Sequence, residues 1–182
     1  MKSKVISIKE KQAVAFDAMK AEFGYKAKLA APRLVKVVVV SATTGRAKDK
    51  NRNEMVMGRL AKITGQKASL RAAKKSIAAF KLREGDKIGV AVTLRGARMT
   101  GFLDKFFNVA IPRTRDFRGY EKKSIDEMGN VTLGVKEQTI FPEVSDEDVK
   151  DLFGLAVTVV TTAKNKKEAT AFFDILGVPF KK

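Results

Sequence analysis

The chain has 182 residues, 45% of them hydrophobic, so its length and composition indicate one folded domain spanning residues 1–182 rather than a disordered chain. Its 37 lysines and arginines outnumber its 20 aspartates and glutamates, and the resulting formal net charge of +17 favours a polyanionic partner. It contains no histidine and no cysteine, which excludes disulfides, thiol nucleophiles and imidazole bases and argues against a zinc site.

The N-terminal segment has no feature of an export signal. Residues 1–9 hold an apolar run that is too short for a signal peptide. The longest apolar run, Val37–Val40, is far shorter than the roughly 20 residues that cross a membrane. We therefore expect an intracellular protein without a membrane partner. Residues 1–9 are expected to form a flexible N-terminal segment.

Two helices and one strand are predicted in the first third of the chain. Residues 10–23 have the spacing of an amphipathic helix, and Gly24 follows in the position of a C-cap glycine. The β-branched segment 33–41 predicts a strand, the polar segment 42–52 an exposed loop, and residues 53–63 a second helix. The positions expected to be buried in these helices are Ala13, Phe16, Ala18, Phe23, Val56, Leu60 and Ile63.

The middle of the chain predicts a strand, a long basic loop, a second strand and a helix. Residues 66–72 fit a short strand, and residues 73–84 form the loop that follows it. Residues 87–95 alternate as a half-buried strand does, and residues 97–110 have the spacing of a helix that faces a core. The apolar stripe of this helix is Met99, Phe102, Leu103, Phe106, Phe107 and Ala110.

The last third is predicted to contain shorter elements. They are a basic-aromatic loop at 113–120, a turn at Gly129-Asn130 before a strand at 131–136, a short helix opened by Ser145–Asp148, a strand at 155–162, and a final helix that begins at a capping box of Asn165 and Glu168 and ends at Leu176.

Several successive strands have no helix between them, which excludes a purely parallel sheet. The order of elements predicts an α+β fold with a largely antiparallel sheet, covered by helices on one face, and a long basic loop. On the strand at 87–95, the uncovered face is expected to hold Gly89, Ala91, Thr93 and Arg95. These small, polar and basic residues suit a face that receives a phosphate backbone.

The two basic loops are the main chemical signal. The first has positive charges on both sides of Ile77 and Phe80, and the second, at 113–120, has three arginines around Phe117. One interpretation is a solvated loop with incidental charges. The other is a nucleic-acid contact, in which the charges bind phosphates and the apolar groups pack on bases or sugars. The positive residues of the first loop and its flank are Arg71, Lys74, Lys75, Lys81 and Arg83.

No sequence motif indicates an enzyme. The chain lacks both Gly-rich phosphate-binding patterns, and no convergent pair of general acid and base is visible. The acidic run around Asp146 could bind a divalent metal, but acids at the start of a helix explain it better. We therefore expect no cofactor, no metal site and no catalytic residue. A DNA-reading protein would need a recognition helix rich in Arg, Asn and Gln, which is also absent.

Several stretches of the sequence, in one order and covering about residues 10–182, resemble the bacterial-type family of ribosomal protein five of the large subunit. The stretches that carry the resemblance are Thr64–Lys67, Arg71–Gly85, Val92–Gly96, Arg113–Gly119, Asn130–Gln138 and Ile140–Glu143.

This resemblance implies a structural protein of the ribosome's central protuberance. Such a protein binds 5S rRNA, joins it to large-subunit rRNA, contacts P-site tRNA through the loop at 73–84, and meets a small-subunit head protein. The implied rRNA-binding residues are Thr43, Thr44, Arg46, Gln66, Lys67, Thr93, Arg95, Arg113, Arg115 and Arg118. The implied tRNA-contacting residues are Lys74, Lys75, Ser76, Phe80, Lys81 and Arg83.

The sequence departs from the family pattern at residues 39–46, where the family's asparagine is replaced by Val40. Ser41, Thr43, Thr44 and Arg46 are the candidates to supply that polar contact instead. An RNA-directed enzyme or an RNA chaperone that uses the same basic face is the alternative interpretation. An organelle ribosome is the alternative to a cytoplasmic one.

Overall fold

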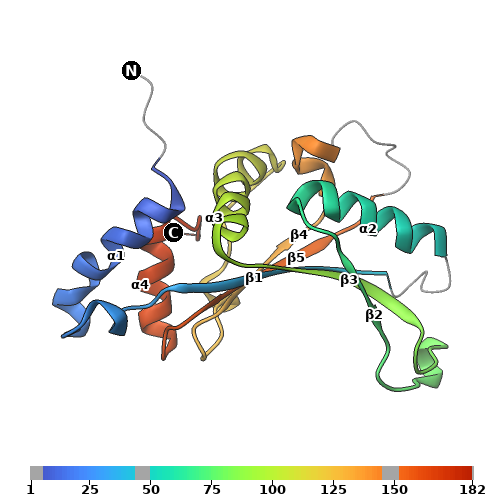
Figure 1. Ribbon diagram of the computed structural model, residues 1–182, viewed down its shortest axis with the longest axis horizontal. Coiled ribbons are helices and arrows are strands. Elements are labelled where there is room, and N and C mark those ends of the chain that lie inside the picture. The colour runs from blue at the N-terminus through green and yellow to red at the C-terminus, as the bar shows by residue number, and fades with distance from the viewer. Residues whose placement is uncertain (1–5, 44–49, 145–151, 182) are drawn as a thin grey trace. The chain divides into compact units, whose positions relative to one another are not determined.

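The computed structural model describes residues 6–43, 50–144 and 152–181 (Figure 1). It has an α+β fold, in which the described strands form one antiparallel sheet in the order β2-β3-β1-β5-β4. The strands are β1 (Leu34–Ala42), β2 (Ser69–Ala72), β3 (Lys87–Leu94), β4 (Val131–Val135) and β5 (Leu155–Thr161). The helices are α1 (Ile8–Phe23), α2 (Lys50–Thr64), α3 (Gly96–Lys105) and α4 (Lys166–Leu176).

The chain divides into two compact units, and the residues of strands β1, β4 and β5 are divided between them. Unit 1 contains the residues up to Val37, Arg95–Leu133, and those from Thr158 onward. Unit 2 contains Val38–Leu94 and Gly134–Val157. Short helical turns complete them, namely η1 (Lys28–Ala30), η3 (Ala78–Phe80), η4 (Phe106–Ala110), η5 (Ile111–Arg113), η6 (Lys122–Ser124), η7 (Gln138–Ile140) and η8 (Pro142–Val144).

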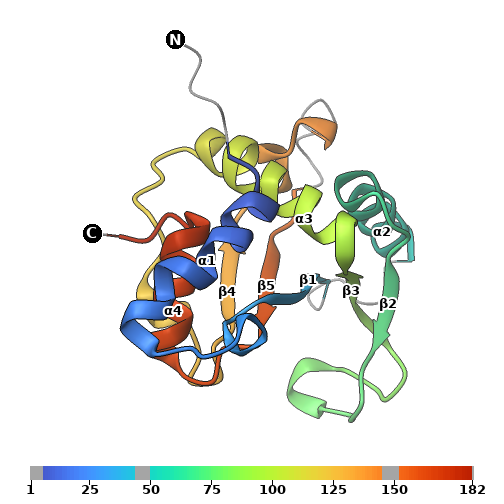
Figure 2. The same cartoon turned by 60° about the vertical axis from the view of Figure 1, so that its left-hand side comes forward.

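In unit 1, helix α1 packs against α4 and α3 (Figure 2). Ser7 caps its N-terminus in a reciprocal capping box with Glu10, so residues 8 and 9 belong to this helix rather than to a flexible segment. Gly24 ends it in the left-handed conformation, as predicted. Three interactions within the unit hold α1 and the residue that follows its cap: Asp104 accepts from the N–H of Ile8, Lys11 donates to the carbonyl of Leu176, and the Tyr25 hydroxyl donates to Glu168.

The prediction of which face of α1 is buried was wrong. The buried residues are Ile8, Ala15 and Met19, whereas Ala13 and Ala18 are exposed and Phe16 and Phe23 are half-buried. The helix carries apolar residues on most of its circumference, so its spacing alone does not single out one face.

Helix α3 supplies the aromatic core of unit 1. All six residues of its predicted stripe are buried, and Phe106 stacks on Phe102 with ring centroids 5.9 Å apart. From Phe106 the backbone widens into a turn of π-helix that continues to Ala110, and Pro112 lies in the 3₁₀ turn that ends the segment. The apolar spacing therefore predicted the buried face of this helix correctly but not its change of pitch.

In unit 2, helix α2 packs against β2 and β3 (Figure 1). Its stripe of Val56, Leu60 and Ile63 is buried, as predicted. Strands β2 and β3 pair antiparallel, with Ser69 opposite Ala91 and a register shift after Arg71. In the ranges that the structure describes, no helix is both long and apolar enough to cross a lipid bilayer.

The face of β3 that was predicted to be open is only partly so. Arg95 is exposed and Thr93 is half-buried, but Gly89 and Ala91 are buried. A Cβ on Gly89 would lie 3.0 Å from the carbonyl oxygen of Ser41, so the neighbouring backbone approaches it closely. Small residues do not reach beyond their neighbours on adjacent strands, and the prediction overlooked this.

The capping box predicted for α4 is only half formed, and its acid has another role. Asn165 accepts from the N–H of Glu168, but the Glu168 carboxylate accepts from the N–H of Lys164 and from the Tyr25 hydroxyl. Partial burial, and secondarily the hydrogen bond to Glu168, raises the pKa of Tyr25 well above its ordinary value. The short helix predicted at Ser145–Asp148 lies outside the described residues.

We expect Tyr25→Phe to lower the free energy of unfolding by about 1–2 kcal/mol, because Glu168 is 4% exposed and loses one of its donors. Urea denaturation followed by circular dichroism measures this. Because folding raises the pKa of Tyr25, its hydroxyl contributes its full share to the free energy of unfolding below a pH of about 10 and a declining share above it. The difference in the free energy of unfolding between wild type and variant should therefore narrow at alkaline pH. Glu168→Gln keeps one acceptor oxygen for the N–H of Lys164, and its amide N–H can donate to the Tyr25 hydroxyl oxygen, so it is expected to cost less than Tyr25→Phe; an equal or larger loss would contradict this account.

Candidate nucleic-acid interface

Residues 73–86, which we call the basic arm, join β2 to β3 and form a structured hairpin. At its base, the N–H of Ala73 donates to the carbonyl of Asp86 at 2.8 Å, and the N–H of Gly85 donates to Ala73. Further out, Ile77 and Leu82 form an antiparallel bridge with reciprocal hydrogen bonds of 3.0 and 3.2 Å. The arm therefore has its own backbone ladder, which the sequence had not predicted.

Side chains of the arm strengthen this ladder. Ser76 Oγ accepts from the N–H of Glu84 at 2.9 Å, and the Asp86 carboxylate accepts from the N–H of Arg83 at 2.8 Å. Lys81 closes the 3₁₀ turn η3 in the left-handed conformation, with φ of 52°. This conformation is unusual for lysine, so the tip of the arm is held in a defined but sparsely populated backbone geometry.

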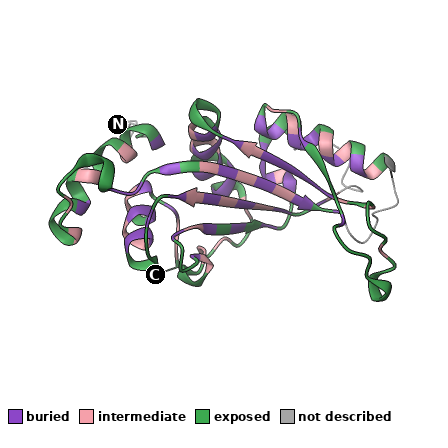
Figure 3. Cartoon of the chain, turned by 60° about the horizontal axis from the view of Figure 1, so that its bottom comes forward, coloured by how far each residue is buried: buried purple, intermediate pink, exposed green. Residues whose placement is uncertain are grey.

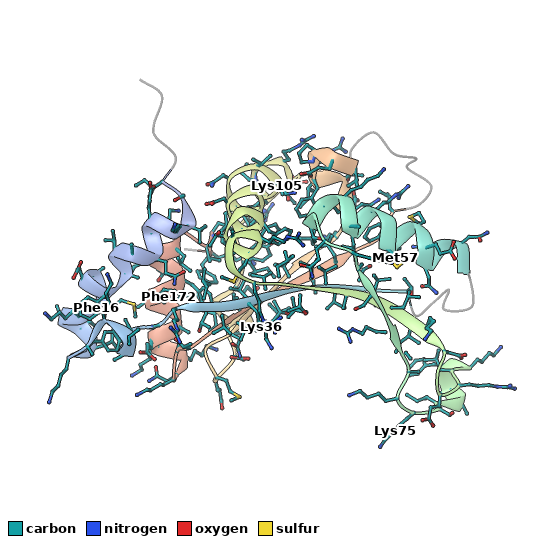
Figure 4. The ribbon with its side chains drawn as sticks, in the orientation of Figure 1. Phe16, Lys36, Met57, Lys75, Lys105 and Phe172 are labelled. Atoms are coloured by element: carbon teal, nitrogen blue, oxygen red, sulfur yellow. The ribbon has the colours of Figure 1, made fainter. Side chains whose placement is uncertain are left out.

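The arm offers cations and exposed apolar groups together. Figure 3 shows it as exposed along most of its length, and Ile77 and Phe80 are 45% and 70% exposed. Lys75 points away from the arm in Figure 4. Lys74, Lys75, Lys81 and Arg83 have no ion-pair partner among the residues that the structure describes. These positive groups are free to bind phosphates, and the Phe80 ring is free to stack.

The turn between α2 and β2 places two further predicted residues in unit 2. Gly65 adopts φ of +66° there, and the Thr64 hydroxyl donates to the carbonyl of Leu60 at 2.7 Å. The Gln66 amide donates to the carbonyl of Thr93 at 3.0 Å, which ties the turn to β3. Gln66 and Thr93 are thus brought together, with both side chains half-buried and Lys67 exposed beside them.

Unit 1 holds the remaining predicted arginines. Arg95 follows β3 directly and is exposed. Arg113, Arg115 and Arg118 are exposed on the segment 113–119, which we call the arginine loop. Within the described part of the chain, none of these four guanidinium groups has an ion-pair or hydrogen-bond partner. Planar guanidinium groups without such partners suit bidentate contacts to phosphate.

The segment after β1 differs from the exposed loop that was predicted. Thr43 is 4% exposed, and its N–H donates to the carbonyl of Ile88 at 2.9 Å, so it continues the strand pairing. Its hydroxyl has no hydrogen-bond partner within the described ranges. Ser41 is also buried, and its hydroxyl donates to the carbonyl of Gly154. Thr44 and Arg46, the other candidates in this segment, lie outside the described residues.

Sequence reasoning missed the residues that shape the arginine loop. Asp116 adopts φ of 51°, and Gly119 adopts φ of 88°. The rings of Phe117 and Tyr120 pack edge-to-face, with their centroids 5.2 Å apart, and burial raises the pKa of Tyr120. Gly119 is a local turn signal, but no pattern in the sequence indicates what lies against it. No cluster of potential metal ligands occurs among the described residues.

Comparison with known proteins found matches over nearly the whole chain. Residues 28–83 match the family described as "Ribosomal protein L5", and residues 87–180 match the C-terminus of the same ribosomal family. Similar proteins named "Large ribosomal subunit protein uL5" occur in several bacteria. That of Heliobacterium modesticaldum is 49% identical over 90% of this chain and 91% of its own. The values are 48%, 94% and 93% for Ureaplasma urealyticum, and 46% over the full length of both chains for Mycoplasma mycoides.

Proposed function

This chain belongs to the ribosomal protein L5 family, and from that premise we propose that it is a structural constituent of the large ribosomal subunit that binds 5S rRNA and joins it to large-subunit rRNA. The proposed place of action is the ribosome, which in bacteria is cytoplasmic. The role is one of binding rather than catalysis. The observation that carries the proposal is that unpaired, exposed cations are displayed on two structured loops of a +17 protein.

The proposed rRNA contacts come from polar and basic groups in both units. In unit 2 they are the half-buried pair Gln66 and Thr93 with exposed Lys67. In unit 1 they are Arg95 and the three arginines of the arginine loop. Such groups bind RNA by shape and backbone rather than by reading a duplex in its major groove, because side chains do not reach into the narrow A-form groove.

The basic arm is proposed to serve a separate ligand, P-site tRNA. Its internal ladder makes it a self-contained projection of β2 and β3, and its cations lie beyond Ala73 rather than on the sheet. The family relationship supports a large-subunit location for the arm, and its chemistry supports an RNA ligand. Neighbouring ribosomal proteins, including one of the small-subunit head, are further proposed partners.

The two roles are separable by mutation. We expect Arg95→Ala to weaken 5S rRNA binding by about 5- to 100-fold, the loss of one charge-assisted phosphate contact. The arm variant, with Lys74, Lys75, Lys81 and Arg83 all changed to Ala, should keep wild-type 5S rRNA affinity apart from a modest long-range charge effect. Ribosomes that carry the arm variant should release P-site tRNA faster. Isothermal titration and tRNA dissociation kinetics measure these effects.

A charge-matched control separates contact from net charge. Lys9, Lys26, Lys28 and Lys123 are exposed in unit 1 and form no ion pair within the described ranges, so changing all four to Ala removes the same charge as the arm variant. This control should leave tRNA release unchanged. The proposed division of roles is wrong if the arm variant loses 5S rRNA as severely as Arg95→Ala does, or if its tRNA release equals that of wild type.

A further inference from the structure

The C-terminal residues pair directly with Tyr120, the residue that follows the arginine loop. The N–H of Tyr120 donates to the carbonyl of Pro179, and the N–H of Lys181 donates to the carbonyl of Tyr120, both at 2.8 Å. Tyr120 and Phe180 thereby form a parallel bridge. We call residues 179–181 the tail strap. It lies in unit 1 with the arginine loop, so the pairing is internal to one compact unit.

The contact between loop and strap is close enough to require glycine. Gly119 has φ of +88°, and a Cβ there would lie 2.8 Å from the backbone nitrogen of Lys181 and 2.9 Å from the carbonyl carbon of Phe180. Both atoms are backbone atoms, which cannot turn aside as a flexible side chain can. The strap therefore fixes the path of the loop at Gly119 by direct backbone packing.

The remainder of the loop is fixed at its other end and in the middle. The N–H of Thr114 donates to the carbonyl of Ile111 at 2.9 Å, and the Phe117 ring packs in a T-shaped pair with the Tyr120 ring. Between these anchors, Arg113, Arg115 and Arg118 are exposed and make no ion pair within the described residues. The three guanidinium groups form no ion pair or hydrogen bond to the described residues that would hold the loop, so its shape depends on the anchors.

We propose that the tail strap is a positioning element for RNA binding: by clamping Gly119 and Tyr120 it holds the three arginines in the arrangement that receives successive phosphates. This inference rests on the proposed function. A loop fixed before binding loses less conformational freedom when RNA arrives, and therefore binds more tightly than a loose loop with the same charges. Phe180 and Lys181 act through the loop and need not touch RNA.

The test is deletion of residues 179–182, measured as the salt dependence of 5S rRNA binding to the full chain and to the shortened one. The slope of log K against log salt is negative, and each lost phosphate contact reduces its magnitude by about 0.7–0.9. We expect the deletion to reduce the magnitude of the slope by about 2 and the affinity by about tenfold or more. Gly119→Ala, which crowds the strap, is a second variant and should act in the same direction. Lys181→Ala removes the exposed ion pair with Glu121 but keeps the backbone bridge, so it should act less.

A double-mutant cycle distinguishes positioning from direct contact or general destabilisation. In a chain with Arg113, Arg115 and Arg118 changed to Ala, the deletion should have no further effect. The inference is overturned if the deletion leaves affinity and slope at wild-type values, if it lowers affinity as much without the arginines as with them, or if the triple variant binds as wild type does. If the intact chain does not bind RNA, the proposed function fails on its own. In that case the role of the tail strap is tested by amide hydrogen exchange of residues 114–120 in the free protein. The deletion must accelerate this exchange more than Lys181→Ala does.

Discussion

Raising the salt concentration from 50 to 200 mM is expected to weaken binding of this chain to 5S rRNA by about 10³–10⁵-fold. The reason is that several exposed cations have no acidic partner in the described part of the protein, and so are free to displace counterions from phosphates. They include Lys67, Arg95 and the arginines of the arginine loop. An interface of roughly 6–10 phosphate contacts gives this dependence. A fluorescence or filter-binding titration at several salt concentrations measures the slope.

The matched comparison uses the charge-control variant with Lys9, Lys26, Lys28 and Lys123 changed to Ala. It lowers the net charge as four contact substitutions would, yet its salt slope should stay close to that of wild type because those lysines are proposed to lie outside the interface. A flat salt dependence of the wild-type protein, or an equal loss of slope in the control, would show that binding does not run through the named phosphate contacts.

The largest loss of stability is expected for Phe106→Ala, at about 3–5 kcal/mol in the free energy of unfolding. Phe106 is 0% exposed, stacks on Phe102, and lies 5.5 Å from the ring of Phe107. It also opens the π-helical turn, in which the Phe106 carbonyl accepts from the N–H of Ile111. Removing the ring leaves a cavity in the aromatic core of unit 1. Urea denaturation measures the change.

Val109→Ala is the control for the same turn. Val109 is 40% exposed, so its loss should cost well under 1 kcal/mol. Phe106→Leu fills part of the cavity and should fall between the two. If Phe106→Ala and Val109→Ala destabilise equally, the aromatic cluster is not what holds this part of unit 1 together.

The sequence was sufficient to predict the elements whose pattern is set by burial on one side. The β-branched run of β1, the stripe of α2 and the six-residue stripe of α3 all occupy the expected positions. The stripes of α2 and α3 recur with the helical period, whereas β1 is marked by its β-branched run rather than by alternation with polar residues. The glycine at the end of α1 and the one at the end of α4 were equally readable, because both ends need left-handed backbone.

The errors arose where tertiary neighbours decide. Alternation along β3 did not reveal that Gly89 and Ala91 are buried, since that depends on which strands flank it. Composition marked the segment after residue 42 as a loop, but Thr43 pairs with the backbone of Ile88 and is buried. Glu168 was taken for a capping residue, whereas its carboxylate also meets Tyr25, a partner distant in sequence.

For the candidate site, the basic residues could be predicted from the sequence, but the backbone interactions that hold their loops could not. The cations of the arm and of the arginine loop are visible as charge clusters. The ladder between Ile77 and Leu82 carries no turn signal of the usual kind, because Lys81 rather than glycine adopts the left-handed conformation. The bridge between Tyr120 and Phe180 joins residues about a third of the chain apart, and no local pattern encodes such a pair. Contact of the predicted residues with rRNA and tRNA stays a prediction, which the binding and dissociation measurements test.

The edge position of strand β2 affects how readily the free chain associates with other copies of itself. It is an edge strand of the sheet, and an exposed edge invites another chain to add a strand and begin an aggregate. Here the edge is short, from Ser69 to Ala72, carries an exposed arginine, and has its register broken after Arg71. These are features that blunt strand addition. The β2 edge is therefore a poor template for adding a strand from a second copy of this chain.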